Sequence, residues 1–159
     1  MDRTLFVLVC VAALGSAIVG GIFYGFSSFV MRALGRLPPE QGVAAMNSIN
    51  VVVITPSFML AFIGTSLLCL VLAAMSFVWW GEISGKLVVV AALLYLAASF
   101  GLTMTLHQPM NLKLAALSPA QALAYWPEYL ATWVRWNHVR TAAPLLSAAL
   151  FVAALLLRR

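Results

Sequence analysis

The sequence predicts an all-α fold, a four-helix transmembrane bundle with short interfacial helices in the first and third connections. Of its 159 residues, 64% are hydrophobic and only 8% are charged, and the mean hydropathy is +1.05. A soluble domain carries about 25% charged residues, whereas four apolar runs of this chain are long enough to cross the hydrocarbon core of a membrane. We therefore expect residues 1–159 to form a single transmembrane domain.

The first transmembrane helix is predicted over about residues 4–34. Its apolar stretch is longer than the core of a cleavable secretory signal, so we expect it to remain in the protein. Small residues recur on it at four-residue spacing, at Ala12, Ser16 and Gly20. Such a face allows a neighbouring helix to approach closely.

The second transmembrane helix is predicted over about residues 51–80, after a short interfacial helix over residues 43–50. Pro56 lies in its first turns and predicts a bend there. The third helix is predicted over about residues 86–106, because Pro109 is expected to end it.

The fourth transmembrane helix is predicted over about residues 127–157, because Pro127 suits a first-turn position. Ser118-Pro119 predicts the start of a separate short helix in the third connection, and Pro144 predicts a kink. Aromatic residues near the two ends of the helices are typical of interfacial belts. They are Trp79 and Trp80 at one end, and Tyr125, Trp126, Tyr129, Trp133 and Trp136 at the other.

The distribution of basic residues predicts an inner or plasma membrane protein with both termini in the cytoplasm. An even number of spans places the termini on one side, together with Arg3, Lys86, Arg158 and Arg159. The opposite end carries Arg32, Arg36, Lys113, Arg135 and Arg140. We give less weight to Arg32 and Arg140, because each lies within an apolar helix and is expected to be held by the bundle.

Polar residues from all four predicted spans converge at one end of the bundle. They are Tyr24, Ser27, Ser28 and Arg32; Asn47, Asn50, Thr55 and Ser57; Thr103, Thr105, His107, Gln108 and Asn111; and Asn137, His138, Arg140 and Thr141. Such groups are costly in lipid unless they bind one another or line a wet cavity. The sequence therefore predicts a polar pocket in one half of the membrane.

Helical geometry leaves two arrangements open for the fourth helix. With ~100° between successive side chains, Trp133, Asn137, Arg140 and Thr141 share one arc, and His138 lies about 160° from Arg140. In one arrangement Asn137 and Arg140 line the pocket and His138 faces a neighbouring helix. In the other, His138 turns inward with Thr141, and Arg140 lies at the rim.

Each of these residues also has a simpler interpretation. Asn50 and Asn137 suit interhelical hydrogen bonding, and Arg140 suits an anchor that extends to the membrane interface. A lone histidine is more often a satisfied polar residue than a catalyst or ligand. The convergence of these residues at one depth favours a functional site.

Several segments resemble one known family of small bacterial and fungal membrane proteins. They are residues 20–34 (GGIFYGFSSFVMRAL), 45–50 (AMNSIN), 100–103 (FGLT), 109–111 (PMN) and 133–141 (WVRWNHVRT). These segments resemble the anthrone oxygenase-like family over nearly the whole chain. One departure is His107-Gln108-Pro109, where the family pattern often has Asn-Val-Pro.

The resemblance implies oxidation of an anthrone-type or other lipophilic aromatic substrate by dioxygen, without a cofactor, although most bacterial members have no assigned reaction. His138 or His107 would act as the base. Asn50, Asn111, Asn137 or Arg140 would stabilise the oxyanion. The expected catalytic residues are His138, His107, Asn137 and Arg140. The expected substrate-binding residues are Tyr24, Ser28, Asn47, Asn50, Thr103, Asn111 and Trp133. The substrate would enter from the lipid bilayer.

A different class of function is a haem-binding protein, with haem b held between His107 and His138 as axial ligands. Copper held by the histidines with Met31, Met104 or Met110 is a weaker alternative.

A non-catalytic membrane subunit, including a self-associating one, is a third class of function. A carboxylate-coupled transporter is disfavoured, because Asp2, Glu40, Glu82 and Glu128 lie at or beyond the predicted helix ends. Nucleic acid is not expected as a partner, because the basic residues are scattered singly.

Overall fold

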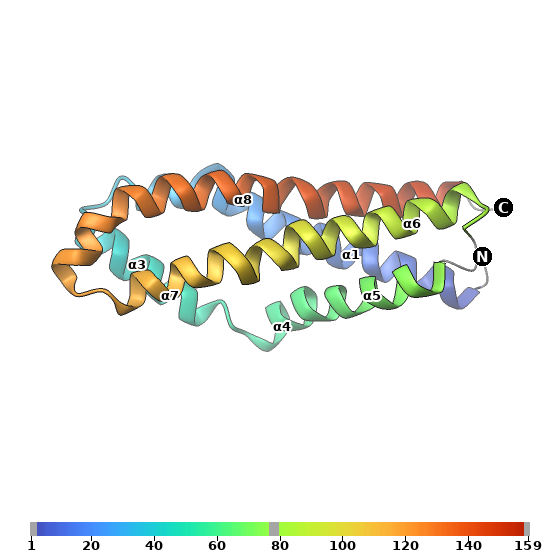
Figure 1. Cartoon of the computed structure of the whole chain (residues 1–159), viewed down its shortest axis with the longest axis horizontal. Helices are drawn as coiled ribbons and strands as arrows, with labels where there is room; N and C mark the ends of the chain where they lie inside the picture. Colours follow the sequence, from blue (N-terminus) through green and yellow to red (C-terminus); the bar gives the residue numbers. More distant parts are fainter. Residues whose placement is uncertain (1–2, 77–79, 158–159) are drawn as a thin grey trace.

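The computed structural model describes residues 3–76 and 80–157, and this part of the chain forms a helical bundle. Four helices are long and apolar enough to cross a membrane: Arg3–Leu34, Pro56–Ser76, Ile83–Ala116 and Pro119–Leu156. The predicted fold class is confirmed. Figure 1 shows the first residues of α1 and the last residues of α8 at the same end of the bundle.

The first span consists of α1 (Arg3–Gly25), a π-helical segment (Phe26–Val30) and α2 (Met31–Leu34). A tight turn then leads into α3 (Pro39–Val52), the short helix expected in the first connection. Arg32 is exposed on α2 rather than held by the bundle. Arg32 must therefore be counted with the other basic residues at its end of the bundle. With Arg32 included, the distribution of basic residues no longer favours placing the termini on the cytoplasmic side.

The second span begins at Pro56 rather than at residue 51. Residues 53–55 interrupt the helix, because the proline ring disfavours helical geometry in the preceding residue, and Thr55 is extended with φ −92° and ψ 151°. The Thr55 hydroxyl accepts a hydrogen bond from the Phe58 amide at 3.2 Å and caps the new helix. The span then runs through α4 (Pro56–Met59), a π-helical segment (Leu60–Gly64) and α5 (Thr65–Ser76). Trp80, the predicted end, lies in a turn, and Trp79 lies outside the described residues.

The third span does not end before Pro109, as the sequence had suggested. It consists of α6 (Ile83–Leu94), π-helical segments at Tyr95–Gly101 and Thr103–His107, and α7 (Gln108–Ala116). Pro109 lies in the first turn of α7, directly after the π-helical segment Thr103–His107. A missing backbone N–H is tolerated at such a position.

The fourth span, α8 (Pro119–Leu156), is one long helix. It begins at the predicted Ser118-Pro119, where the Ser118 amide donates to the Gln121 side chain at 3.1 Å in a capping box. The helix is not short, however, and Pro127 and Pro144 both lie inside it. The predicted start at residue 127 is therefore wrong, and the short helix predicted from Ser118-Pro119 is the first part of α8 itself.

The four spans pack in a ring in which α1 contacts α8 and α5, and α6 contacts α8 and α5. The predicted small-residue face of α1 makes the close approach to α8. A Cβ atom added to Gly20 would lie 2.7 Å from a methyl group of Leu145. Towards α5, a Cβ atom on Gly15 would overlap the Thr65 hydroxyl.

Three of the aromatic residues expected in an interfacial belt are instead buried. Trp126, Tyr129 and Trp133 are 3%, 0% and 2% exposed. They pack between α8, α3 and α2 in a core cluster separate from that of the opposite half. They therefore build the interior of the half that contains the candidate site.

Candidate functional site

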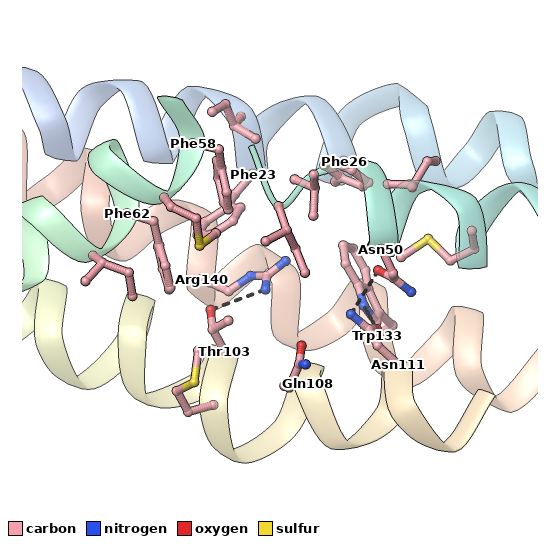
Figure 2. A pocket seen from close by; sticks show the side chains of 18 residues that line it. Phe23, Phe26, Asn50, Phe58, Phe62, Thr103, Gln108, Asn111, Trp133 and Arg140 are labelled. Atoms are coloured by element: carbon pink, nitrogen blue, oxygen red, sulfur yellow. Dashed lines mark hydrogen bonds between the residues drawn. The ribbon is translucent and has the colours of Figure 1, made fainter. Parts of the chain in front are cut away.

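A cavity of about 250 Å³ lies within the half of the bundle remote from Arg3 and Leu156 (Figure 2). This volume is near the lower end of the ~300–1,000 Å³ typical of small-molecule sites. Its walls are mainly aliphatic and aromatic, with five polar side chains among them. The polar lining residues are Asn50, Thr103, Gln108, Asn111 and Arg140. The sequence predicted a polar pocket at this end of the bundle, and the structure has a largely apolar cavity with a few polar groups.

Three π-helical segments surround this cavity and orient its lining. Phe26–Val30 contributes Phe26, Leu60–Gly64 contributes Phe62, and Thr103–His107 contributes Thr103. A π-helical turn contains an extra residue and changes the direction of the side chains that follow it, and such turns are frequent at functional sites. No pattern in the sequence indicated these π-helical turns.

Arg140 on α8 lies against the cavity and is only 6% exposed. Its Nε and Nη2 atoms donate to the Asn137 side-chain oxygen at 3.1 and 2.7 Å. Its Nη1 atom donates to the Thr103 hydroxyl at 3.3 Å. The guanidinium carbon also lies 4.0 Å from the centre of the Phe23 ring and 5.1 Å from that of Trp133. Neutral amide, hydroxyl and aromatic groups therefore hold the cation.

No carboxylate pairs with Arg140 in the part of the chain that the structure describes. Glu40, Glu82 and Glu128 are exposed, and Asp2 lies outside the described residues. A buried cation without a counter-ion is costly in a membrane. This arrangement therefore favours an anionic ligand, or one that becomes anionic during reaction.

Asn137 connects this cation to the first span. It is fully buried, and its amide donates to the Phe23 carbonyl at 2.9 Å and to the Ser27 hydroxyl at 2.8 Å. The Ser27 and Thr141 hydroxyls are 2.9 Å apart. Asn137 does not line the cavity, so it positions Arg140 rather than touching a ligand.

A second polar cluster centres on Asn111. Its side-chain oxygen accepts hydrogen bonds from the Tyr129 hydroxyl at 2.7 Å and from the Trp133 indole at 3.1 Å. Its amide nitrogen donates to the Asn50 oxygen at 3.0 Å. Because an indole N–H can only donate, Trp133 fixes the orientation of both amides. The cluster ties α3, α7 and α8 together at the wall of the cavity.

His107 is buried, at 1% exposed, but it does not line the cavity. Its Nδ1 atom faces the Leu102 carbonyl at 3.2 Å and its Nε2 atom faces the Trp133 carbonyl at 3.3 Å. The ring also stands edge-on to Trp133, with centroids 5.0 Å apart. Neither nitrogen is directed at a ligand, so the geometry does not support the predicted role as a base.

His138 is exposed on the outer face of α8. Of the two arrangements considered for the fourth helix, the inward His138 is wrong, and Arg140 with its partner Asn137 lies inside. The two histidines are therefore not placed as axial ligands of a shared haem. Of the methionines considered for copper, Met104 lines the cavity, whereas Met31 and Met110 belong to the core cluster that contains Trp126 and Tyr129.

The predicted substrate-binding residues divide into two groups. Asn50, Thr103, Asn111 and Trp133 line the cavity, whereas Tyr24, Ser28 and Asn47 do not. Tyr24 is 58% exposed, and the Ser28 hydroxyl donates to the Tyr24 carbonyl of its own helix at 2.7 Å. Asn47 lines a different cavity, of about 280 Å³, between α3, α7 and the start of α8.

Four phenylalanines that line the cavity, Phe23, Phe26, Phe58 and Phe62, could not be identified from the sequence. Hydropathy does not distinguish an apolar side chain that faces a cavity from one that faces lipid. Gln108 was expected among the converging polar residues but was given no role. Its side chain lines the cavity and makes no hydrogen bond within the described part of the chain.

A family model described as anthrone oxygenase matches residues 57–150, more than half of the chain. The matched segment contains Thr103, Asn111, Trp133 and Arg140, whereas Phe23 and Asn50 precede it. No curated protein and no solved structure matches the chain.

Proposed function

The chain belongs to the anthrone oxygenase family, and we propose on this premise that it is a membrane-embedded oxygenase. Its substrate is a lipophilic aromatic ketone of the anthrone type, bound in the cavity beside Arg140. The observation that carries the proposal is the buried Arg140 guanidinium, which has no carboxylate partner in the described chain and lines an otherwise apolar cavity.

The chemistry of an anthrone explains why such a cation is useful. Loss of a proton from the methylene carbon gives an enolate whose negative charge lies largely on the ketone oxygen. A preorganised guanidinium at that oxygen stabilises the anion most where charge develops, within a largely apolar cavity. Arg140 therefore lowers the free energy of the enolate and of the transition state that leads to it.

The electron-rich carbon then transfers electrons to dioxygen and forms a carbon–oxygen bond. Protonation gives a hydroperoxide at the former methylene carbon. Loss of the remaining hydrogen of that carbon as a proton, with cleavage of the oxygen–oxygen bond, leaves a new ketone and releases water. One anthrone and one dioxygen thus give one quinone and one water, and the electrons come from the carbon–hydrogen bonds.

This proposal assigns no histidine the role of the base. His107 is bound to two carbonyl groups and His138 lies on the outer face of α8. Stabilisation of the enolate by Arg140 instead makes the methylene proton acidic enough to pass to water. Catalysis then depends on electrostatic stabilisation more than on a positioned proton acceptor.

The break between α3 and α4 is the proposed entrance for the substrate. Val53 and Ile54 line the cavity, and Ile54 is also 63% exposed on the outside of the bundle. Val52 and Leu60, on either side of the break, are 64% and 75% exposed. A lipophilic substrate and dioxygen, both enriched in the bilayer, would reach the cavity there without crossing water.

The proposal is tested with the purified protein in lipid nanodiscs and a hydroxylated anthrone. Oxygen uptake and quinone absorbance are measured, and the rate with empty nanodiscs is subtracted because anthrones oxidise slowly by themselves. We expect Arg140→Gln to lower the catalysed rate by about 100-fold or more, as for loss of an oxyanion donor. Ser147→Ala, on the same helix but in the opposite half, is the matched control and should retain the rate. A wild-type rate equal to that of empty nanodiscs would refute the proposal.

A further inference from the structure

The guanidinium of Arg140 retains two hydrogen-bond donors that its neighbours do not use. A guanidinium has five N–H groups, and the structure gives Arg140 one hydrogen bond from each of Nε, Nη1 and Nη2. One N–H on Nη1 and one on Nη2 therefore have no partner in the described chain. They belong to a side chain that is 6% exposed and lies against the cavity.

The direction of these two donors follows from the positions of the partners. Asn137 occupies the edge formed by Nε and Nη2. Figure 2 shows the Thr103 hydroxyl on the side of Nη1 that faces the aliphatic part of the Arg140 side chain. The remaining edge, between Nη1 and Nη2, points away from the Arg140 backbone and across the cavity that Arg140 lines.

The surroundings of Arg140 hold this edge in a fixed orientation. The Phe23 and Trp133 rings pack against the guanidinium, with centroids 4.0 and 5.1 Å from its central carbon. Phe23 and Trp133 are themselves 4% and 2% exposed. The two free N–H groups therefore form a rigid planar fork at the wall of the cavity.

A fork of this kind binds two neighbouring oxygen atoms in one plane, whereas a lysine ammonium is a point charge without such geometry. We propose that Arg140 selects ligands that present two adjacent coplanar oxygens, either a carboxylate or a ketone flanked by a hydroxyl on a fused ring. The cavity then prefers such a ligand over an analogue with a single oxygen. The aromatic character of the ligand rests on the proposed function, whereas the oxygen pair rests on the geometry of Arg140.

The test is equilibrium binding without oxygen, so that it is independent of turnover. Two matched pairs of ligands are titrated into the wild-type protein in nanodiscs: anthrone against an anthrone with a hydroxyl beside the ketone, and a hydroxymethylanthracene against an anthracene carboxylate. We expect the two-oxygen member of at least one pair to bind about tenfold more tightly, as for an additional charge-assisted hydrogen bond. The pair that shows the preference identifies the source of the oxygens.

Arg140→Lys separates the fork from the charge. We expect this variant to bind the two anthrones within about threefold of one another and to prefer the carboxylate less than the wild type does, because an ammonium keeps the charge but loses the paired geometry. Ser147→Ala removes a hydrogen bond in the packed half instead and should retain the preference. Absence of a preference in the wild-type protein, or an undiminished preference in a folded Arg140→Lys variant, would overturn the inference. If Arg140→Lys does not fold, the wild-type pairs decide the question. Failure of oxygen uptake with the preference intact would refute the proposed reaction alone.

Discussion

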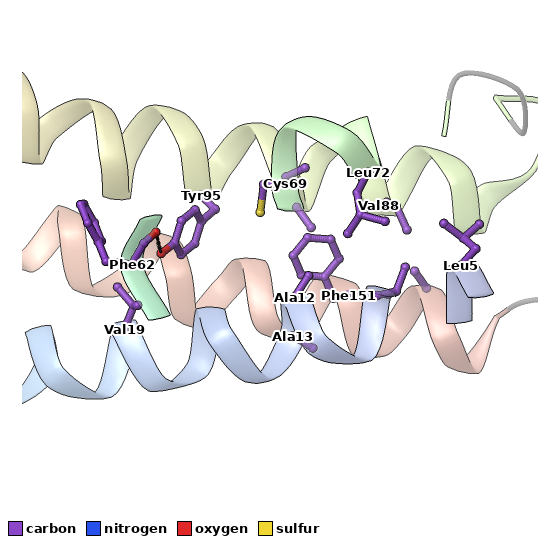
Figure 3. Packing of buried hydrophobic residues seen from close by; sticks show 14 of the residues in the cluster. Leu5, Ala12, Ala13, Val19, Phe62, Cys69, Leu72, Val88, Tyr95 and Phe151 are labelled. Carbon is purple, nitrogen blue, oxygen red and sulfur yellow. Dashed lines mark hydrogen bonds between the residues drawn. The ribbon is translucent and has the colours of Figure 1, made fainter. Parts of the chain in front are cut away.

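The two halves of the bundle are built from the same four spans but differ in their interiors. Near the start of α1 and the end of α8, the core is filled by apolar side chains such as Leu72 and Phe151, both fully buried (Figure 3). In the other half, the spans enclose a cavity and a network around Arg140 and Asn137 (Figure 2).

This difference indicates which half supplies stability and which supplies function. Lipid is as apolar as the core of the bundle, so helix association depends on close packing and hydrogen bonds rather than on the hydrophobic effect. The packed half provides that contact through Gly20 of α1 and the aliphatic core. The cavity half contains an unpaired cation, which favours ligand binding over packing. Substitutions in the two halves should therefore have different consequences.

Phe151→Ala should have the largest effect on stability. Phe151 lies at the centre of the packed half, and its removal leaves a large space among residues of all four spans. We expect the free energy of unfolding to fall by about 3 kcal/mol or more. Unfolding by a denaturing detergent, followed by circular dichroism, measures this change. The activity per folded molecule should remain near that of the wild type, and a selective loss of activity would show that the halves are not separate.

Asn137→Leu should have the next largest effect, this time on activity. Leucine cannot accept from the two Arg140 nitrogens or donate to the Phe23 carbonyl and the Ser27 hydroxyl. We expect oxygen uptake to fall by about 100-fold, similar to loss of an oxyanion donor, because Arg140 loses its orientation. The unfolding free energy should fall by only about 1–3 kcal/mol.

The Asn137→Leu prediction has a matched control and an outcome that would contradict it. Ser147→Ala removes one buried hydrogen bond of α8, from the hydroxyl to the Ala91 carbonyl, within the packed half. It should cost about 0.6 kcal/mol and leave oxygen uptake unchanged. Full activity in a folded Asn137→Leu protein would mean that Arg140 does not need this support.

Tyr95→Phe should have a smaller effect and defines the boundary between the halves. The fully buried Tyr95 hydroxyl donates to the Phe62 carbonyl at 3.2 Å. Phe62 belongs to the packed core and also lines the cavity. We expect a loss of about 0.6 kcal/mol in unfolding free energy and a change of less than about threefold in ligand affinity. A larger change in affinity would place Tyr95 in the functional half.

The architecture could be predicted from the sequence because long apolar runs have few alternatives in a membrane. Apolar runs and small residues such as Gly20 predicted the spans and the α1–α8 contact. Prolines misled the prediction of boundaries. Pro109 and Pro127 lie within continuous helices, whereas Pro56 begins one. Whether a proline ends a helix depends on π-helical turns and tertiary packing, which no local pattern specifies.

The candidate site was predicted less completely than the fold. The arc containing Asn137 and Arg140 was correct, because helical periodicity fixes which side chains share a face. Neither histidine lines the cavity, and the inward arrangement of His138 is wrong, because periodicity does not show which face points inward. Phe23 and Phe62 could not be identified as cavity residues, since lipid-facing and cavity-facing phenylalanines have the same hydropathy.

His138→Ala should have the smallest effect. It compares two neighbouring positions of the cavity half, Asn137 inside the bundle and His138 on its surface. His138 is adjacent to Asn137 in the sequence but is exposed on the outer face of α8. Because its side chain is outside both the polar network and the cavity, we expect oxygen uptake within about twofold of the wild type and a stability change within about 0.5 kcal/mol. Steady-state oxygen uptake and detergent unfolding measure the two quantities. His138→Ala and Asn137→Leu thus alter neighbouring positions with opposite expectations. A large loss of activity in His138→Ala would restore the histidine as a catalyst and would require α8 to rotate during turnover.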